Sequence, residues 1–530
     1  MKRKMRLFVA VILCVTVMMP MTGCRDKGNS PAEGAKADVN FSYPIETDET
    51  LTYWVRLPAT LSTSVKNYGE TPFAQEQEKQ TGVRVEYQHP AQGQEAEALN
   101  LLIASGDMPD IIETNWIGQP GGAASAIANS TIIPLNDYLV DTGSALKKYL
   151  EENPDIDKMV KTDEGEYFAF PFIRGDESLL ASQGLMIRKD WLDELKLEVP
   201  TTIDEWDAML RQFKEKKGSE APLSLLNGQL RAFMGAFGLT PDYVIQDGKV
   251  KYSPMEPGYI DFLKTIKKWY DDSLIDRDIA VMDKKMYDSN ILSGRSGATQ
   301  GAGGSGMGYW LNAMKDKDEK FDLVAAPYPT LTKGERAKIG YKELPFAPLG
   351  SAAITTSCKK PALAVEFLDY AYTEKGHMLN NFGVEGVSYN MVDGYPAYTD
   401  VILKNPDKLS VSQAMPLYMR SSIEAPIVQD KRYLEQYYTL PQQKEAVKVW
   451  GDNDYDKYTL PRISYTEAES SELANISTEV STYAAEMQLK YILGEEDLAN
   501  FDKFQQQLKN LKVDRMLEIV QTAVDRYNAR

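Results

Sequence analysis

The side chains best suited to acid–base and metal chemistry are scarce in this chain. Its 530 residues include two histidines, His89 and His377. A metal centre built from several histidines is therefore excluded, and neither histidine lies near a nucleophile pattern of the Gly-x-Ser-x-Gly type. The sequence also has no His-Glu-x-x-His motif and no paired Cys-x-x-Cys motif. These observations argue against metal-dependent hydrolysis and against Ser-His-Asp catalysis, so no catalytic residue is assigned.

A glycine-rich run stands near the middle of the chain, with five glycines between residues 301 and 308. A phosphate-binding P-loop would end in Lys followed by Ser or Thr, and this run has no such ending. We therefore interpret it as a flexible or tightly turning backbone next to Trp310. A nucleotide site is the less favoured alternative.

An acidic loop near residue 454 has the spacing that opens a calcium loop, with Asp452, Asp454 and Asp456 at alternate positions. An EF-hand needs Gly at the sixth position and Glu at the twelfth, where this chain has Lys457 and Ile463. We interpret the segment as a solvated loop. No cofactor is predicted, and a structural calcium ion is the alternative.

Aromatic side chains are abundant, with seven Trp and thirty Tyr. Many of them follow predicted strands or helices instead of lying on apolar helix faces. Rings beside polar groups suit sugars, because the C–H faces of a sugar stack on them while its hydroxyls take hydrogen bonds. Local packing is the alternative for each single residue. The aromatic residues in such loops are Trp116, Tyr167, Phe172, Trp310, Tyr389 and Trp450. By contrast, Trp191, Trp206 and Trp269 keep helical spacing and are predicted core.

The N-terminus is organised as an export signal. Basic residues precede an apolar run from Leu7 to Met19, and Cys24 directly follows Thr22-Gly23. The segment resembles the lipobox of bacterial lipoproteins, in which the cysteine is lipidated and becomes the new N-terminus; an ordinary signal peptide is the alternative. We expect a signal peptide over residues 1–23, a lipid anchor at Cys24 and a flexible tether over 24–48, so that the mature protein lies outside the cytoplasm and is tied to a membrane.

Charge and cysteine content argue against a nucleic-acid-binding protein and against a scaffold built on disulfides. Four of the 59 basic residues and no acidic residues lie in the signal, which leaves 55 basic against 77 acidic residues, a net charge of −22. Nucleic acid and anionic lipid surfaces both require basic residues. Cys358 is the one cysteine remaining beyond Cys24, so an internal disulfide is excluded and a buried thiol is predicted.

The pattern of apolar residues predicts alternating strands and helices. The first series is a strand near 51–56, a helix over 72–80, a strand over 83–87, a helix over 95–104 and a strand over 108–112, which is typical of a parallel sheet covered by helices. A second series includes strands at 185–187 and 222–226 and helices over 190–196 and 259–270. The chain beyond residue 471 is predicted helical.

Several stretches together resemble the family 1 extracellular solute-binding proteins of bacterial ABC importers. The resemblance runs from about Leu51 to the C-terminus and is closest to the long lipoprotein branch of Gram-positive bacteria linked to oligosaccharide uptake. It is carried by the segments 101–112, 184–195, 200–206, 350–355, 361–368, 383–389 and 492–501.

This resemblance implies an α/β fold of the periplasmic-binding-protein type II, with two discontinuous lobes around a ligand cleft, a hinge and a helical C-terminal extension. Mapped onto this chain, lobe one should hold 51–163 and 323–395, and lobe two 166–322 and 396–530. The chain should cross between the lobes near Gly165, at Val324–Pro327 and near Tyr395.

Ligand-binding residues are expected in loops at the carboxyl ends of strands. Trp116 and Tyr389 are predicted as stacking platforms, and Asn115, Arg174 and Glu385 as partners of sugar hydroxyls. The full predicted set is Trp54, Arg56, Asn115, Trp116, Phe172, Arg174, Arg295, Gln300, Trp310, Glu385 and Tyr389.

The resemblance therefore implies a monomeric receptor without enzyme activity. It would capture a carbohydrate, most simply an oligosaccharide, and present it to the permease subunits of an ABC transporter. Two alternatives remain open at this point. One is a secreted glycosidase or lyase, which needs two carboxylates in one cleft, one of them with a raised pKa. The other is a receptor for peptides or another solute, which favours charged cleft ends over aromatic platforms.

Overall fold

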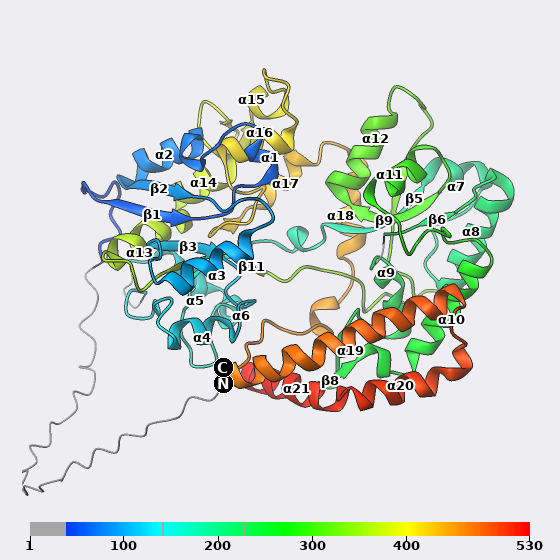
Figure 1. Cartoon of the computed structure of the whole chain (residues 1–530). Helices are drawn as coiled ribbons and strands as arrows, with labels where there is room; N and C mark the ends of the chain where they lie inside the picture. Colours follow the sequence, from blue (N-terminus) through cyan, green and yellow to red (C-terminus); the bar gives the residue numbers. More distant parts are fainter. Residues whose placement is uncertain (1–38, 140–142, 227) are drawn as a thin grey trace, which may run out of the picture.

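A computed structural model describes residues 39–139, 143–226 and 228–530 of the chain. Two sheets, each covered by helices, lie side by side and define two lobes (Figure 1). The predicted signal peptide and Cys24 fall outside the described residues. Within the described part, no helix is both long and apolar enough to cross a membrane.

The first lobe is built on a six-stranded sheet with the strand order β14-β4-β11-β3-β1-β2. Strands β1, β2 and β3 run parallel, as the alternating series of strands and helices predicted, and β11 pairs antiparallel with both β3 and β4. The strands are β1 (Thr50–Trp54), β2 (Arg84–Gln88), β3 (Ile111–Thr114), β4 (Phe170–Arg174), β11 (Phe346–Ile354) and β14 (Val428–Gln429).

Helices and one hairpin cover this sheet. The helix α2 begins where Thr71 accepts a hydrogen bond from the Ala74 amide and ends at Gly82 in the left-handed conformation, as the sequence signals indicate. The helices are α1 (Ala59–Ser62), α2 (Pro72–Thr81), α3 (Glu95–Ser105), α4 (Gly122–Ala128), α5 (Ala145–Glu152), α6 (Pro154–Met159), α13 (Pro361–Asp369), α14 (Glu374–Phe382), α15 (Asp400–Leu403) and α16 (Val411–Tyr418), and the hairpin pairs β12 (Tyr389–Val392) with β13 (Tyr395–Tyr398).

The end of the expected tether belongs to the first lobe. From residue 39 onward, four apolar side chains at alternate positions pack against its core, and the Ile45 amide donates to the Thr81 carbonyl. The Tyr43 hydroxyl donates to the Glu366 carbonyl at 2.7 Å. The prediction of a flexible tether up to residue 48 is therefore wrong for residues 39–48, because the alternating apolar residues give this segment a face to bury.

The second lobe contains a four-stranded sheet with the order β10-β5-β9-β6. Strand β9 leads into a single wide helical turn, η5, which holds most of the glycine-rich run. A Cβ added at Gly303 or Gly304 would lie within 3 Å of Tyr438 or Tyr437, so any other residue would displace that tyrosine side chain. The elements are β5 (Gln183–Arg188), β6 (Leu223–Ser224), β9 (Ala298–Ala302), η5 (Gly303–Gly308) and β10 (Leu323–Ala326).

The helices of the second lobe bury the aromatic residues that were predicted as core. Trp191, Trp206 and Trp269 are at most 6% exposed, and the prediction is confirmed. The remaining elements of this lobe and of the segments that lead into it are η2 (Glu177–Leu180), α7 (Lys189–Leu195), α8 (Ile203–Lys217), α9 (Arg231–Met234), η3 (Gly235–Phe237), β7 (Tyr243–Gln246), β8 (Lys249–Tyr252), η4 (Ser253–Met255), α10 (Gly258–Asp271), α11 (Lys284–Leu292), α12 (Tyr309–Met314), α17 (Lys431–Tyr437), α18 (Pro441–Gly451) and η7 (Tyr455–Lys457).

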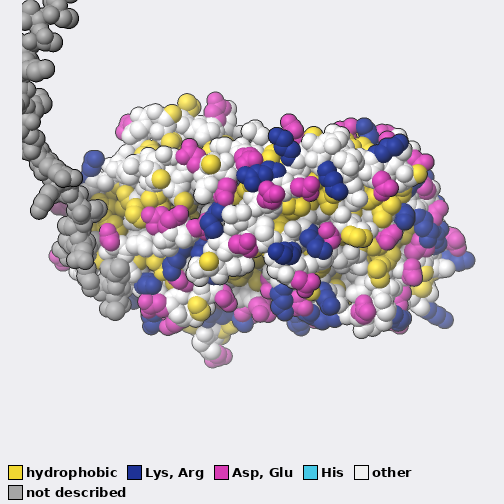
Figure 2. All heavy atoms as spheres, turned by 90° about the horizontal axis from the view of Figure 1, so that it is seen from below, with side chains coloured by type: hydrophobic (Ala, Val, Ile, Leu, Met, Phe, Trp, Pro, Cys, Tyr) yellow, Lys and Arg dark blue, Asp and Glu magenta, His cyan; other side chains and the backbone are white. Residues whose placement is uncertain are grey.

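The C-terminal part is helical, as predicted, and reaches back to the first lobe. It consists of α19 (Glu467–Leu493), α20 (Phe501–Asn510) and α21 (Val513–Ala529). At the end of α21, Arg526 and Arg530 pair with Asp163 of the first lobe. Acidic and basic side chains are interspersed over the face to which these helices contribute (Figure 2).

The chain passes between the two sheets at other positions than expected. The crossing segments are 175–182, 327–345 and 430–440. Strand β4 belongs to the first sheet, where it pairs with β11 and β14, so residues 166–174 and 396–429 stay with the first lobe. Strand β10 pairs with β5 and belongs to the second. The predicted boundaries were wrong here because strand pairing is a long-range property that local apolar patterns do not encode.

Candidate functional site

Five side chains from both lobes meet where the lobes join, and we call them the junction cluster. Arg174 stands at the end of β4 in the first lobe, and Arg231 begins α9 in the second. Tyr341 and Glu343 lie on the crossing segment 327–345. Arg462 comes from the segment between η7 and α19, and its Nε donates to the Phe346 carbonyl of the first sheet at 2.9 Å.

Four of the five side chains form a continuous chain of contacts. The Arg231 guanidinium lies over the Tyr341 ring, 4.3 Å from its centroid. The Tyr341 hydroxyl donates to Glu343 Oε1 at 2.9 Å, and Glu343 Oε2 lies 3.8 Å from Arg174 Nη2. Arg174 also donates to the Leu344 carbonyl at 3.2 Å. All five side chains are partly buried, so solvent reaches them only in part.

Positive charge exceeds negative charge in this cluster, since three guanidinium groups face one carboxylate. Burial lowers the pKa of Arg462, and the neighbouring Arg174 lowers it further while Glu343 opposes the change. Burial and the carboxylate of Glu343 raise the pKa of Tyr341 to about 12, so its hydroxyl stays protonated and remains a donor near neutral pH.

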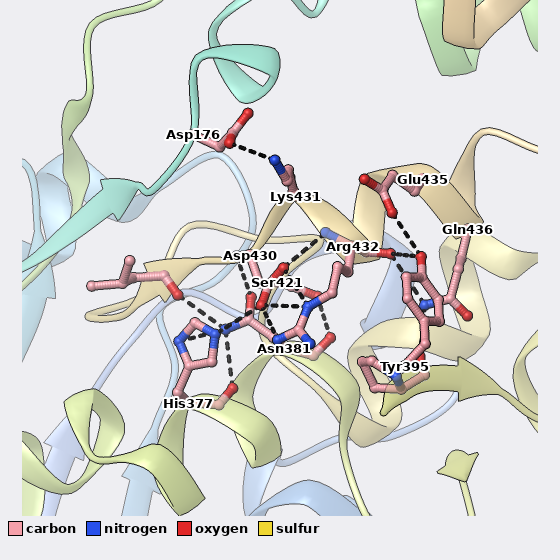
Figure 3. Close-up of polar contacts among 12 residues, drawn as sticks. Asp176, His377, Asn381, Tyr395, Ser421, Asp430, Lys431, Arg432, Glu435 and Gln436 are labelled. Carbon is pink, nitrogen blue, oxygen red and sulfur yellow. Dashed lines mark hydrogen bonds and ion pairs between the residues drawn. The ribbon is translucent and has the colours of Figure 1, made fainter. Parts of the chain in front are cut away.

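A second polar network lies at the other crossing, where β14 leads into α17 (Figure 3). Asp430 caps α17 by accepting from the Arg432 amide at 2.8 Å, and its carboxylate also contacts the Arg432 guanidinium at 2.6 Å. His377 Nε2 lies 3.0 Å from the same carboxylate. Asn381 accepts from the Asp430 amide and donates to the Val428 carbonyl. Each partner is thus used within the network, which we call the hinge network.

The electrostatics of the hinge network favour a charged carboxylate. Burial on its own would raise the pKa of Asp430, but hydrogen bonds from His377 and Arg432 outweigh that effect and hold the pKa well below its usual range. Asp176 of the first crossing segment pairs with Lys431 of the third at 3.1 Å. The two segments are therefore tied together beside the network (Figure 3).

Four of the predicted aromatic ligand residues are buried in the first lobe. Trp116 is 0% exposed, and its indole N–H donates to the Ile112 carbonyl at 3.3 Å. Trp54, Phe172 and Tyr389 are at most 5% exposed. Trp116 and Tyr389 therefore present no free ring face on which a sugar could stack. The prediction of stacking platforms is corrected here, because these loop aromatics complete the core.

The predicted polar residues of the first lobe are dispersed. Arg174 belongs to the junction cluster. Arg56 is about half exposed and pairs with Glu424 at 2.7 Å. Asn115 is partly exposed, and its Oδ1 accepts from the Gly118 amide, which shapes the loop after β3. Glu385 is exposed next to the β12–β13 hairpin. Of this group, the structure brings only Arg174 into the junction cluster.

The predicted residues of the second lobe are engaged in its own packing. Arg295 pairs with the buried Asp276 at 2.5 Å. Trp310 is fully buried and donates to Asp288 Oδ1 at 2.9 Å. Gln300 on β9 is also fully buried, and both atoms of its amide lack a hydrogen-bond partner among the described residues. Arg295 and Trp310 are therefore structural here, contrary to the prediction.

Two hollows on the surface of the molecule are large enough to hold a small ligand. A hollow of about 1030 Å³ is lined by residues 235–248, 329–339 and 454–458, all outside the first sheet. A smaller one of about 660 Å³ lies between the lobes, lined by the loop after β3 and α4 on one side and by the start of α19 on the other. Neither contains a residue of the junction cluster.

The negative charge of the acidic loop at 452–456 is partly neutralised by an arginine of the same chain. Arg336 pairs with Asp452 at 2.6 Å and with Asp454 at 2.9 Å. Among the described residues there is no group of three or more His, Cys, Asp or Glu side chains placed to hold a metal ion. Cys358 is buried as predicted, and burial raises the pKa of its thiol to about 12.

Sequence reasoning missed four of the five junction residues: Arg231, Tyr341, Glu343 and Arg462. They are separated by up to 231 positions in the chain, and no motif joins them. One usable signal was present, because an aromatic and a carboxylate, Tyr341 and Glu343, stand two residues apart shortly after the predicted crossing at Val324–Pro327.

The chain is similar in sequence to known solute-binding proteins. The model of the bacterial extracellular solute-binding protein family matches residues 62–378. The fructooligosaccharide ABC transporter substrate-binding protein FusA of Streptococcus pneumoniae is 24% identical, over 98% of each chain. The polygalacturonan/rhamnogalacturonan-binding protein YtcQ of Bacillus subtilis is 25% identical, over 55% of this chain and 58% of the relative.

Solved structures show the same fold. The alginate-binding protein AlgQ2, crystallised without calcium ion, has a TM-score of 0.70 at 24% identity, covering 90% of this chain and 99% of that one. FusA of S. pneumoniae in complex with kestose has a TM-score of 0.70 at 22% identity, covering 91% and 100%. Two lobes, three crossing segments and a family match over more than half of its length lead to one conclusion: the chain belongs to the bacterial extracellular solute-binding protein family.

Proposed function

We propose that this protein is the receptor of a bacterial ABC importer, which captures an oligosaccharide between its lobes and presents it to the membrane permease. The observation that carries the proposal is the match to FusA, a protein named for fructooligosaccharide transport, over 98% of both chains. The ligands in the names of the relatives differ from one to the next. The names of the relatives therefore do not identify the sugar that this chain binds.

The junction cluster supports ligand capture at this position. Its side chains come from the first lobe, the second lobe and the segments between them, so a solute bound there contacts both halves of the molecule at once. A ligand held in this way favours a closed arrangement of the lobes over an open one. The guanidinium and hydroxyl donors of the cluster suit the oxygen-rich surface of a sugar.

The alternative of a glycosidase or lyase finds no support in the carboxylates. Within the described residues, the carboxyl groups with a raised pKa are Asp242 and Asp369. Asp369 accepts hydrogen bonds from the Ser144 hydroxyl and from two amides at the start of α5, which is a structural role. Asp242 is exposed in the second lobe and does not belong to the junction cluster, so neither raised carboxyl stands in the proposed cleft as the acid that glycoside hydrolysis needs.

The test is a thermal-shift screen of the purified full chain in detergent against neutral oligosaccharides, acidic oligosaccharides and peptides. A ligand that binds the folded state at about a hundred times its Kd stabilises the protein by about 2.7 kcal/mol. We expect a shift with at least one oligosaccharide and no release of new reducing ends. Stabilisation by peptides but by no sugar would overturn the proposal, and sugar turnover would replace it with an enzyme.

We further propose that Cys24 carries a lipid that holds the receptor at the cell membrane. The support is the lipobox-like sequence around Cys24 and the apolar segment before it. A tethered receptor stays close to its permease, which raises its local concentration there. The variant Cys24→Ala should release the protein from the membrane fraction and lose incorporation of labelled fatty acid. Retention of both in the variant would contradict the anchor.

A further inference from the structure

The guanidinium of Arg231 is the least satisfied polar group at the lobe junction. Its Nε is buried and has no hydrogen-bond partner, and no carboxylate among the described residues pairs with it. Its side chain contacts the Tyr341 ring instead, at 4.3 Å. A charged group that is partly removed from water without a counter-charge is unfavourable in the free protein. Such a residue is expected where a ligand supplies the missing partner.

Arg462 and Arg174 add to this excess. Arg462 uses its Nε on the Phe346 carbonyl, and no partner for its two terminal nitrogens is found in the described part of the chain. Arg174 reaches Glu343 only at 3.8 Å, beyond hydrogen-bond distance. Glu343 is also engaged by Tyr341 at 2.9 Å, so one carboxylate is shared between a hydroxyl and a distant guanidinium. The junction cluster therefore holds guanidinium donors in excess of its acceptors.

This excess stands out against the rest of the chain. The whole sequence has 77 acidic and 59 basic residues, and most arginines of the second lobe are paired; Arg211, for example, contacts both Asp207 and Asp272. An acidic protein repels anions at long range, so a local excess of arginine over carboxylate is not explained by solubility or by general charge. Planar guanidinium groups with free paired N–H donors match the geometry of carboxylates.

We propose that the ligand of this receptor is an acidic oligosaccharide, whose sugar carboxylates are bound by Arg231, Arg462 and Arg174 at the junction between the lobes. This inference rests on the proposed receptor function and specifies its ligand class. Tyr341 orients the site by supporting Arg231 through its ring and Glu343 through its hydroxyl. Neutral sugar units of the same chain would take the remaining donors.

The experiment compares matched ligands on the full chain in detergent by calorimetric titration. Oligomers of galacturonate, of glucuronate and of mannuronate or guluronate are each tested beside their carboxyl-reduced counterparts, which keep length and linkage but lose the charge. Neutral fructans and a sulfated oligosaccharide complete the panel. We expect at least one uronate oligomer to bind at least about tenfold more tightly than its reduced form, and less tightly as salt rises.

Variants locate the effect. Arg231→Gln should weaken uronate binding by about 10- to 100-fold, as expected for loss of a charge-assisted hydrogen bond. Arg277→Gln is the matched control, since Arg277 also lies over a tyrosine ring, Tyr270, at 4.5 Å, but outside the junction cluster. It should leave binding unchanged. Arg231→Lys, which keeps the charge, should recover part of the affinity, and the melting temperature without ligand shows whether each variant is folded.

The outcomes separate this inference from the receptor function. Equal affinity for a uronate oligomer and its reduced form, or binding of neutral fructans only, would overturn the acidic ligand and leave the receptor function intact. Binding of the sulfated sugar alone would overturn the assignment to carboxylates. If no sugar binds, the proposed function and this inference fail together. Equal losses of affinity in the Arg231 and Arg277 variants would show that the junction cluster does not bind the ligand.

Discussion

The two polar networks at the lobe junction differ in how completely their groups are paired. In the hinge network, Asp430 accepts from Arg432 and His377, and Asn381 ties the backbone on both sides. In the junction cluster, Arg231 has no carboxylate partner and its Nε no acceptor among the described residues. A saturated network fixes the backbone, whereas an unsaturated one keeps donors for another molecule. The comparison separates the residues that hold the lobes from those that hold the ligand.

The largest effect is expected in the hinge network. Asp430→Ala removes the cap of α17 and leaves Arg432 and His377 without their carboxylate. We expect a loss of about 3 kcal/mol in the free energy of unfolding, since it combines a helix cap with a charge-assisted pair. Denaturant unfolding measures it. Asp176→Ala, which removes the more exposed pair to Lys431, is the control and should cost less than about 1 kcal/mol. Equal losses of unfolding free energy in the two variants would show that the hinge network contributes no more to stability than the exposed Asp176–Lys431 pair.

The hinge network should also make the free energy of unfolding depend on pH in the acidic range. The folded-state pKa of Asp430 is lowered, so its contribution is fully present above the unfolded value of about 3.9 and is lost as the pH falls toward the folded value. Asp430→Asn lacks this contribution. The difference in unfolding free energy between wild type and Asp430→Asn should therefore shrink as the pH falls from about 5 to about 3. A difference that stays constant over this range would show that the carboxylate is not held in its charged form.

A smaller effect is expected at Tyr341. Tyr341→Phe keeps the ring beneath Arg231 but removes the hydroxyl that donates to Glu343 at 2.9 Å. We expect a loss of about 1 kcal/mol in the stability of the free protein, the usual net value of one hydrogen bond. Thermal unfolding followed by calorimetry measures it. A loss as large as that of Asp430→Ala would mean that the junction cluster also holds the lobes.

The smallest effect on stability is expected at Arg231 itself. Its guanidinium has no acceptor in the free protein, so Arg231→Gln should change the unfolding free energy by less than about 0.5 kcal/mol or raise it slightly. The measurement is denaturant unfolding without ligand. A loss above about 2 kcal/mol would identify Arg231 as a structural residue.

Local patterns in the sequence predicted most of the elements. The burial of Trp206 and Trp269 and the helical structure of the C-terminal part both follow from spacing along a few turns. The crossing points did not follow, because the placement of β4 in the first sheet depends on β11 and β14, more than 170 and 250 residues away. The apolar pattern of a segment indicates that it forms a buried strand, whereas pairing with other strands determines which sheet it joins.

The candidate site was predicted in one residue, Arg174, and missed in the rest. Loop aromatics such as Trp116 were expected to face a ligand, but a loop that closes over a sheet also needs large side chains to fill its core. Arg231 and Arg462, which were not predicted, lie in no sequence motif. They are candidate ligand residues because their guanidinium groups have no carboxylate partner among the described residues. This can be recognised only when their neighbours in space are known.

The central claim is that ligand is captured between the lobes, and small-angle X-ray scattering tests it most directly. The full chain in detergent is measured without ligand and then with a saturating concentration of the oligosaccharide that stabilises it most. Closure of two lobes around a solute makes the molecule more compact, so we predict a smaller radius of gyration with ligand for the wild type and for Arg277→Gln. An unchanged radius of gyration at full saturation would contradict capture between the lobes.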